Sequence, residues 1–178
     1  IGTGLVGSEM CIRDRYRSDT TTVFNIEIIN WMPSSGGEVT TDGKPLGIDS
    51  DGVSRVAMAV DQLGIEFYDI DTIGSEPVLS SRFDLEGNAE QVKLTSTGAF
   101  VSCDDFGAYF LSNSYIESGQ GSVTHFAEDL TVDHISVNGD IAVLSIGSKG
   151  IALYDVSDPL NPEPRGIFDV GYIYSCLL

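Results

Sequence analysis

Short apolar runs alternate with polar turns along most of the chain, from about residue 20 to residue 175. The runs are 5 to 8 residues long and rich in Val, Ile, Phe and Tyr, and Gly, Asn, Asp and Ser separate them. This composition is typical of β-strands joined by tight turns. No stretch places apolar residues at i, i+3, i+4 and i+7 over three turns, which excludes a helical solenoid. The pattern predicts an all-β protein.

The strand pattern repeats along the chain. Gly64, Gly107 and Gly150 are each separated by 43 residues, and each glycine opens an apolar strand. Two further strands precede each glycine, and a fourth follows it and ends at a phenylalanine: Phe83, Phe126 and Phe168. Four strands in a repeat of about 40 to 50 residues is the pattern of a β-propeller blade, in which stacked sheets share a core. A sandwich would not account for the spacing.

The repeat divides the chain into units. In a partial blade at 16–44, VFNIEII from Val23 is predicted as the third strand and GEVTT from Gly37 as the fourth. Residues from 172 begin another inner strand. Because closed propellers usually have four to eight blades, we expect an open, partial β-propeller with uncovered apolar faces on its first and last blades. The three complete blades are expected at 45–87, 88–131 and 132–171.

The two ends resemble a laboratory sequence. Residues 5–15, LVGSEMCIRDR, match the translation of a transposase-type sequencing-library adapter, and residues 176–178 fit the reverse complement of the same adapter's end. Matches at both ends in opposite orientations favour a translated environmental read, native from about Tyr16 to Ser175. We therefore set residues 1–15 and the last three apart from fold reasoning, and expect a piece of a longer protein.

A glycine motif lies in the excluded segment. Gly2, Gly4 and Gly7 form G-x-G-x-x-G, and Glu27 follows Gly7 by 20 residues, the spacing of a dinucleotide site. That site needs a preceding strand and following helices, which the sequence lacks, so no cofactor is predicted. The exclusion also leaves Cys103 as the one native cysteine, a buried hydrophobe in a strand, and no disulfide framework is expected.

The third repeat resembles a known family. Gly150–Val170 reads GIALYDVSDPLNPEPRGIFDV, which is similar to the LVIVD repeat: a glycine-led apolar strand, Asp-Val-Ser-Asp-Pro, one residue, Asn-Pro and a second apolar strand. The prolines and the Asp and Asn side chains favour a tight turn between the third and fourth strands. The first repeat keeps Tyr68, Asp69 and Pro77, whereas the second has Ser112 in place of the Asp and a longer loop. The resemblance implies an exported or surface-attached bacterial or archaeal propeller, without a particular activity.

Charge excludes two classes of partner. The formal net charge is −18, and there are three lysines: Lys44, Lys93 and Lys149. Without a basic patch to replace counterions, we expect no binding to nucleic acid or to anionic lipid. No apolar run approaches the roughly 18 residues of a membrane helix, so no membrane insertion is predicted for this segment.

Two histidines and two aspartates are the first candidates for chemistry. His134 is expected on an inner strand and His125 on an outer strand, so a shared metal site is not predicted. Asp49 and Asp51, in IDSDG, resemble the start of a calcium loop, but Val60 stands where an EF-hand has glutamate. A hairpin turn accounts for these aspartates better.

The remaining motifs are weaker. Asp104 and Asp105 are expected in a turn between strands, where paired carboxylates would hold at most a weak surface cation. There is no G-x-S-x-G elbow, and Gly147–Gly150 lacks the spacing of a phosphate loop. No catalytic, cofactor-binding or metal-binding residue is therefore predicted.

These observations favour a non-enzymatic propeller module, an interaction or structural platform of an exported or cell-surface protein that binds a protein or a surface polymer. The alternative is a propeller enzyme whose active site lies in the central channel and is built largely by blades outside this segment. A third hypothesis is a calcium-stabilised adhesion segment. The full reading frame would separate the first two hypotheses, and a calcium titration of thermal stability would test the third.

Overall fold

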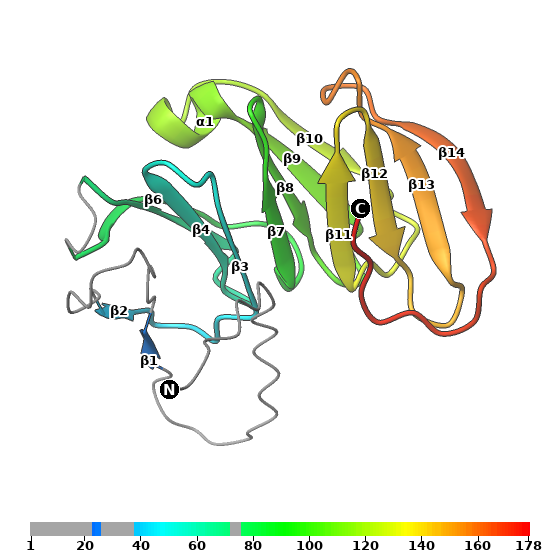
Figure 1. Cartoon of the computed structure of the whole chain (residues 1–178), viewed down its shortest axis with the longest axis horizontal. Helices are drawn as coiled ribbons and strands as arrows, with labels where there is room; N and C mark the ends of the chain where they lie inside the picture. Colours follow the sequence, from blue (N-terminus) through cyan, green and yellow to red (C-terminus); the bar gives the residue numbers. More distant parts are fainter. Residues whose placement is uncertain (1–22, 26–37, 72–75) are drawn as a thin grey trace, which may run out of the picture.

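The computed structural model describes residues 23–25, 38–71 and 76–178, and it confirms the all-β, partial propeller fold (Figure 1). Three four-stranded antiparallel sheets follow one another along the chain, each a meander in which sequential strands pair. The described sheets form an open arc (Figure 1). One sheet falls within each predicted unit.

The first sheet holds β3 (Gly47–Ser50), β4 (Arg55–Ala59), β5 (Ile65–Asp69) and β6 (Val78–Phe83). The second holds β7 (Gln91–Leu94), β8 (Gly98–Ser102), β9 (Ala108–Ser112) and β10 (Val123–Phe126). The third holds β11 (His134–Asn138), β12 (Ile141–Ser145), β13 (Ile151–Asp155) and β14 (Glu163–Phe168). The strands predicted near Val23 and Gly37 are found as the antiparallel pair β1 (Val23–Asn25) and β2 (Glu38–Thr40).

The three repeated glycines occupy the same turn between the second and third strands of each sheet. Their φ angles are 76°, 75° and 92° for Gly64, Gly107 and Gly150, a region that favours glycine. A Cβ on Gly64 would lie 2.2 Å from the carbonyl oxygen of Phe83, and one on Gly150 equally close to that of Phe168. The fourth strand therefore ends against the turn, which explains why the glycine and the phenylalanine keep their spacing.

Backbone bridges join each sheet to the segment that follows it. Asp61 pairs with Ala89, and Asp104 pairs with Val132, 43 residues further on in both members. These bridges set the inner strands β3, β7 and β11 beside one another (Figure 1). The stacking order of the sheets is thus fixed by the backbone as well as by side-chain packing.

Each interface between sheets is a separate apolar core. The first core joins one face of the first sheet to the second sheet, and the second core joins the second sheet to the third. Large buried side chains fill them, with Phe67 in the first and Phe100 and Phe110 in the second. The structure confirms the predicted shared interior, because each of these two cores is formed by side chains from two neighbouring sheets.

The outer faces of the arc differ from each other. The outward face of the first sheet is buried, with Val56, Met58 and Tyr68 packed against Val39 of β2. This contact comes from β2, which was predicted as the fourth strand of the preceding partial blade. The third sheet does leave apolar side chains exposed.

A short helix, α1 (Asn113–Ser118), lies in the loop between β9 and β10, where the sequence predicted no helix. The Ser112 side chain caps its first turn by accepting the N–H of Tyr115, and Gly119 ends it in the left-handed conformation. Ile116 is buried in the first core. A single turn stabilised by caps and one apolar contact is too short to give a periodic signal in sequence.

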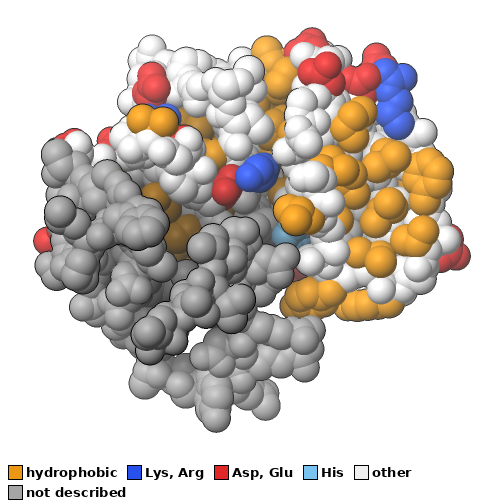
Figure 2. Space-filling model, in the orientation of Figure 1, with side chains coloured by type: hydrophobic (Ala, Val, Ile, Leu, Met, Phe, Trp, Pro, Cys, Tyr) orange, Lys and Arg blue, Asp and Glu red, His pale blue; other side chains and the backbone are white. Residues whose placement is uncertain are grey.

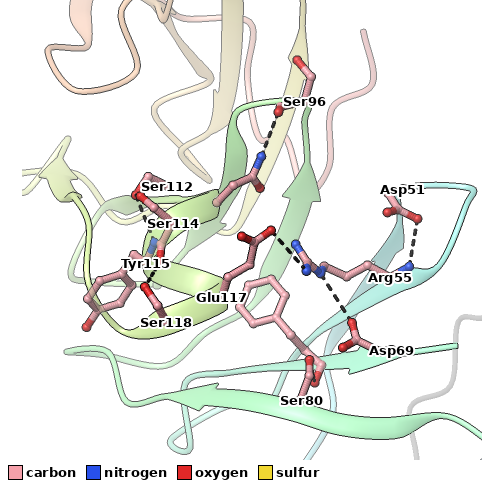
Figure 3. A network of polar contacts seen from close by, with 12 residues as sticks. Asp51, Arg55, Asp69, Ser80, Ser96, Ser112, Ser114, Tyr115, Glu117 and Ser118 are labelled. Carbon is pink, nitrogen blue, oxygen red and sulfur yellow. Dashed lines mark hydrogen bonds and ion pairs between the residues drawn. The ribbon is translucent and has the colours of Figure 1, made fainter. Parts of the chain in front are cut away.

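This helix contacts the first sheet through a polar network (Figure 3). Glu117 lies 3.7 Å from the guanidinium of Arg55, which also lies 3.7 Å from Asp69. The ring of Tyr115 packs 4.7 Å from that of Phe83. The loop of the second sheet is thereby fastened to its neighbour.

Candidate functional site

Asp49 and Asp51 have structural partners. Asp49 lies 3.1 Å from the Lys93 ammonium and accepts the backbone N–H of Leu94 at 2.8 Å, which links β3 to β7. Asp51 accepts the backbone N–H groups of three residues in the β3–β4 turn, at 2.8 to 3.0 Å. Partial burial opposes ionisation of Asp51, but these donors hold its pKa below the ordinary value. The hairpin-turn interpretation is confirmed for Asp51.

Asp104 and Asp105 lie in the turn between β8 and β9, as predicted. Burial and the charge of Asp105 raise the pKa of Asp104, and burial together with Asp104 and Asp61 raises the pKa of Glu90. Thr131 donates a hydrogen bond to Asp105 at 2.8 Å. In the described ranges, no three His, Cys, Asp or Glu side chains are grouped as metal ligands. The turn is a region of carboxylate repulsion.

The two histidines lie on different strands, with separate partners. His125, on the outermost strand β10, stacks on the Tyr109 ring at 4.1 Å, and its Nε2 contacts the Phe106 carbonyl oxygen. His134 begins the inner strand β11, and its Nδ1 lies 3.7 Å from the Sγ of Cys176. Burial lowers the pKa of His134 and raises that of the Cys176 thiol. Both groups therefore stay neutral near pH 7, so they form no thiolate nucleophile.

The other sequence candidates are structural or lie outside the described residues. Cys103 is fully buried, and burial raises its thiol pKa to about 12. Residues 147–150 form the β12–β13 turn, and a strand follows them, as expected for a segment that is not a phosphate loop. The glycine motif at Gly2–Gly7 and Glu27 fall outside the described residues.

One cross-strand position distinguishes the three sheets. The third and fourth strands pair Glu66 with Arg82 in the first sheet, Tyr109 with His125 in the second and Ala152 with Ile167 in the third. Successive members of the third-strand series are 43 residues apart. The same place in the repeat thus holds an ion pair, an aromatic stack and a pair of aliphatic side chains.

In the third sheet this position opens into a groove of about 440 Å³, which we call the linker groove. Ala152, Tyr154 and Ile167 belong to the sheet side of the groove. The segment between the second and third sheets, residues 127–130, forms the other side. Pro164 and Gly166 of β14 complete the lining.

In the second sheet a side chain occupies the corresponding space. The segment 84–87 precedes the second sheet as 127–130 precedes the third, and Glu86 in this segment lies near Tyr109. Tyr109 is 7% exposed, and burial raises its pKa to about 12. Ala152 stands at this position in the third sheet, where Leu130 of the covering segment and the linker groove take up the corresponding space.

Acidic groups rim the linker groove. Glu128 and Asp129 line it and are exposed, and Glu128 Oε1 lies 3.8 Å from the His125 ring. Burial and the charge of Asp129 raise the pKa of Tyr154, whose ring packs edge-on against Phe126. The groove therefore combines an apolar wall, a phenol and two carboxylates.

A second surface lies on the outward face of the third sheet, where Figure 2 shows a gathering of hydrophobic side chains. Ile141 is 40% exposed and Phe168 is 49% exposed. The corresponding phenylalanines of the first two sheets, Phe83 and Phe126, pack against interface cores. Within the described residues, no sheet covers this face.

The last residues follow the path of an inner strand along this face. Ile173 bridges to Gly147, as Val132 bridges to Asp104. The N–H of Leu178 donates to the Ser136 hydroxyl at 3.0 Å. Leu94 makes the corresponding contact with Asp49. The segment from 173 therefore has the register of β7 and β11.

The groove residues were missed by the sequence analysis. Ala152 is an unremarkable member of an apolar strand, and its role depends on which side chains stand opposite it and above it. Alignment of the repeats on Gly64, Gly107 and Gly150 would have placed Ala152 in one column with Glu66 and Tyr109. The change of residue size in that column was the available signal.

The comparisons with known proteins bear on the fold. No family model and no curated protein matches the chain. Among solved structures, the computationally designed Ika4 protein matches with a TM-score of 0.59 and 13% identity, over 76% of this chain and 79% of that one. The designed Ika8 protein matches with a TM-score of 0.61 and 14% identity, over 82% of this chain and 44% of that one.

A natural assembly also contains a similar chain. In the crystal structure of the mitotic checkpoint complex, a chain matches with a TM-score of 0.53 and 14% identity, over 94% of this chain and 48% of that one. This chain thus spans less than half of that protein and of Ika8. These likenesses show the shared propeller-type fold alone. No helix in the described part is long and apolar enough to cross a membrane.

Proposed function

We propose that this chain is a non-enzymatic β-propeller module that binds a protein partner at the linker groove. The observation that carries the proposal is the third-sheet position Ala152–Ile167, which is open where Tyr109 closes its counterpart in the second sheet. A volume of about 440 Å³ lies within the range of roughly 300 to 1,000 Å³ for ligand pockets. A similar chain also belongs to a multiprotein assembly, the mitotic checkpoint complex.

The site is suited to recognition. His134 and Cys176 stay neutral through burial, and the ring of His125 stacks on Tyr109. Nucleophilic catalysis needs an activated thiolate or a base beside a hydroxyl, and neither arrangement occurs among the described residues near the groove. An apolar wall with a few polar groups is typical of a surface that orients a ligand.

A peptide library displayed on phage tests the binding function. The wild-type chain and the double variant Ala152→Tyr/Ile167→His are immobilised in parallel. That variant copies the Tyr109–His125 pair into the third sheet. We expect sequences enriched on the wild type to be lost from the variant, with circular dichroism confirming that it is folded. No enrichment on the wild type, or equal enrichment on both proteins, would contradict the proposal.

The cellular setting rests on the resemblance of Gly150–Val170 to the LVIVD repeat. We propose an exported or cell-surface protein, and a native sequence that extends beyond residues 16–175 with further blades. Sequencing the genomic reading frame on both sides tests this. A secretory signal upstream and more 43-residue repeats are expected. Inner strands that bring His, Arg and carboxylates together from several blades would replace the binding module with the enzyme alternative.

A further inference from the structure

The second sheet contains a side chain that fits the counterpart of the linker groove. Tyr109 projects from β9 beneath residues 84–87, with its ring parallel to that of His125 at an interplanar angle of 6°. Glu86 lies near this tyrosine. The chain thus shows which chemical group this part of a blade accommodates: a phenol ring that stacks on the side chain opposite it on the fourth strand.

The third sheet has Ala152 in the place of that ring, and its covering segment also differs, because Leu130 follows Gly87 by 43 residues and packs against the second core. Ile167 occupies the place of His125, and Asp129 follows Glu86 by 43 residues. Ile167 is 57% exposed, so its side chain is available to pack against a ligand. Burial of an aromatic side chain removes about 150 to 250 Å² of surface from water, which is a large contribution for a small groove.

Charge narrows the class of partner. Glu128 and Asp129 line the groove, and no lysine or arginine does. The neighbouring Arg165 pairs with Asp155 and Glu163. An acidic rim attracts a positively charged segment, and the net charge of −18 adds to this at long range.

Building on the proposed function, we infer that the linker groove binds a tyrosine side chain presented by a basic segment of a partner protein. The ring takes the place that Tyr109 takes in the second sheet and packs on Ile167. The flanking lysines or arginines of the partner lie over Glu128 and Asp129. Recognition thus has two halves: a phenol ring in the interior of the groove and positive charge at its rim.

NMR titration of the isotope-labelled, full-length chain tests the inference without any variant. The probes are p-cresol and three capped tripeptides: Lys-Tyr-Lys, Glu-Tyr-Glu and Lys-Ala-Lys. We expect p-cresol and Lys-Tyr-Lys to shift the amides of 127–130 and 166–167, with a Kd of about 1 mM for p-cresol, because so small a ligand buries few atoms. Lys-Tyr-Lys should bind at least about fivefold more tightly than Glu-Tyr-Glu, and Lys-Ala-Lys should cause no saturable shift.

Two variants test the two halves separately. Ala152→Tyr/Ile167→His closes the groove, so binding of p-cresol and of Lys-Tyr-Lys should be lost. Glu128→Gln/Asp129→Asn changes exposed side chains, so folding is not at risk. It should leave the affinity for p-cresol unchanged and weaken that for Lys-Tyr-Lys about fivefold. Ile141→Ser, on the exposed outward face of the same sheet, is the control and should bind like the wild type.

The outcomes distinguish this inference from the broader proposal. No groove shifts with p-cresol, or binding that persists in the folded Ala152→Tyr/Ile167→His variant, would overturn the inference. Equal affinity for Lys-Tyr-Lys and Glu-Tyr-Glu would overturn its charge half. Should the displayed library select peptides without an aromatic residue that still need an open groove, the interaction function stands and the tyrosine assignment fails.

Discussion

The first and third sheets use the same cross-strand position in opposite ways. In the first sheet, Glu66 is fully buried, bound by the Arg82 guanidinium and by the Tyr68 hydroxyl. In the third sheet, Ala152 and Ile167 make no polar contact through their side chains and leave a groove. Both sheets have the same strand order and the same turn. The side chains at this position can therefore change without a change of fold, and they decide whether a blade is closed or open to a ligand.

The largest effect is expected from breaking the ion pair of the first sheet. Among the described residues, Arg82→Met leaves the buried Glu66 carboxylate with the Tyr68 hydroxyl as its partner, which should destabilise the chain by about 3 to 5 kcal/mol. Urea denaturation measures this. Glu66→Leu/Arg82→Met removes both charges and should recover most of the loss, because apolar pairs often replace buried ion pairs at little cost. A double variant as unstable as Arg82→Met would show that the position needs the charges.

The second effect is expected from opening the second sheet. Tyr109→Ala removes a buried ring and should cost about 3 kcal/mol of stability. It should also create a second groove, so that p-cresol binds two sites per chain in the NMR titration. Tyr109→Phe is the matched control: it keeps the ring, so it should lose much less stability than Tyr109→Ala and leave one site. One site in a folded Tyr109→Ala variant would contradict the equivalence of the two sheets.

A smaller, pH-dependent effect is expected at the turns. Asp61 and Asp104 occupy the turn position that Gly147 occupies in the third sheet, and the pKa of Asp104 is raised. A carboxyl with a raised pKa costs stability while it is ionised. The cost is complete above the folded pKa and disappears as the pH falls below the ordinary value near 4. Because asparagine tolerates the left-handed backbone, Asp104→Asn should stabilise the chain at pH 7, by less than about 1 kcal/mol after solvent screening.

Thermal melts at pH 7 and pH 4 check this prediction. The gain in melting temperature from Asp104→Asn should be larger at pH 7 than at pH 4, because protonation of Asp104 relieves the repulsion as the pH falls. Asp140→Asn, in the exposed turn between β11 and β12, serves as the control and should gain less. Equal gains at both values of pH would show that backbone preference, and not charge repulsion, limits this turn.

The smallest effect is expected from a second Arg–carboxylate pair that is exposed. Arg165 binds Asp155 on the third sheet, and the hydrogen bonds from Ser157 and Arg165 hold the pKa of Asp155 far below its ordinary value. Solvent screens such pairs, so Arg165→Ala should leave the melting temperature within experimental scatter. If Arg165→Ala lost as much stability as Arg82→Met, burial would not explain the difference in strength between the two ion pairs.

The sequence predicted the parts of this fold that depend on backbone geometry. Gly64, Gly107 and Gly150 must be glycine because a Cβ would collide with a neighbouring carbonyl, so their spacing revealed the sheets. The helix at 113–118 was not predicted, because its stability comes from caps and from Ile116 in the first core.

The linker groove was not predictable in the same way. An alanine in a strand says nothing about its surroundings, and the groove exists because Ile167 stands opposite Ala152 while residues 127–130 lie above it. The position of the groove follows from the register in which β13 pairs with β14, which the sequence does not give. Likewise, the sequence placed Asp104 in a turn but could not show that Asp61 lies near enough to help raise its pKa, or that Asp104 in turn helps raise the pKa of Glu90.

The segments that connect the sheets lie over a position at which the side chain can be exchanged while the fold is kept. Residues 84–87 and 127–130 cover the variable position from above, while the strand pairing beneath them involves backbone atoms alone. An exchange of one side chain there alters what a blade recognises without disturbing the hydrogen bonds that hold it. A lineage that gains blades by duplication could therefore acquire new specificities one substitution at a time, each in a scaffold already able to fold.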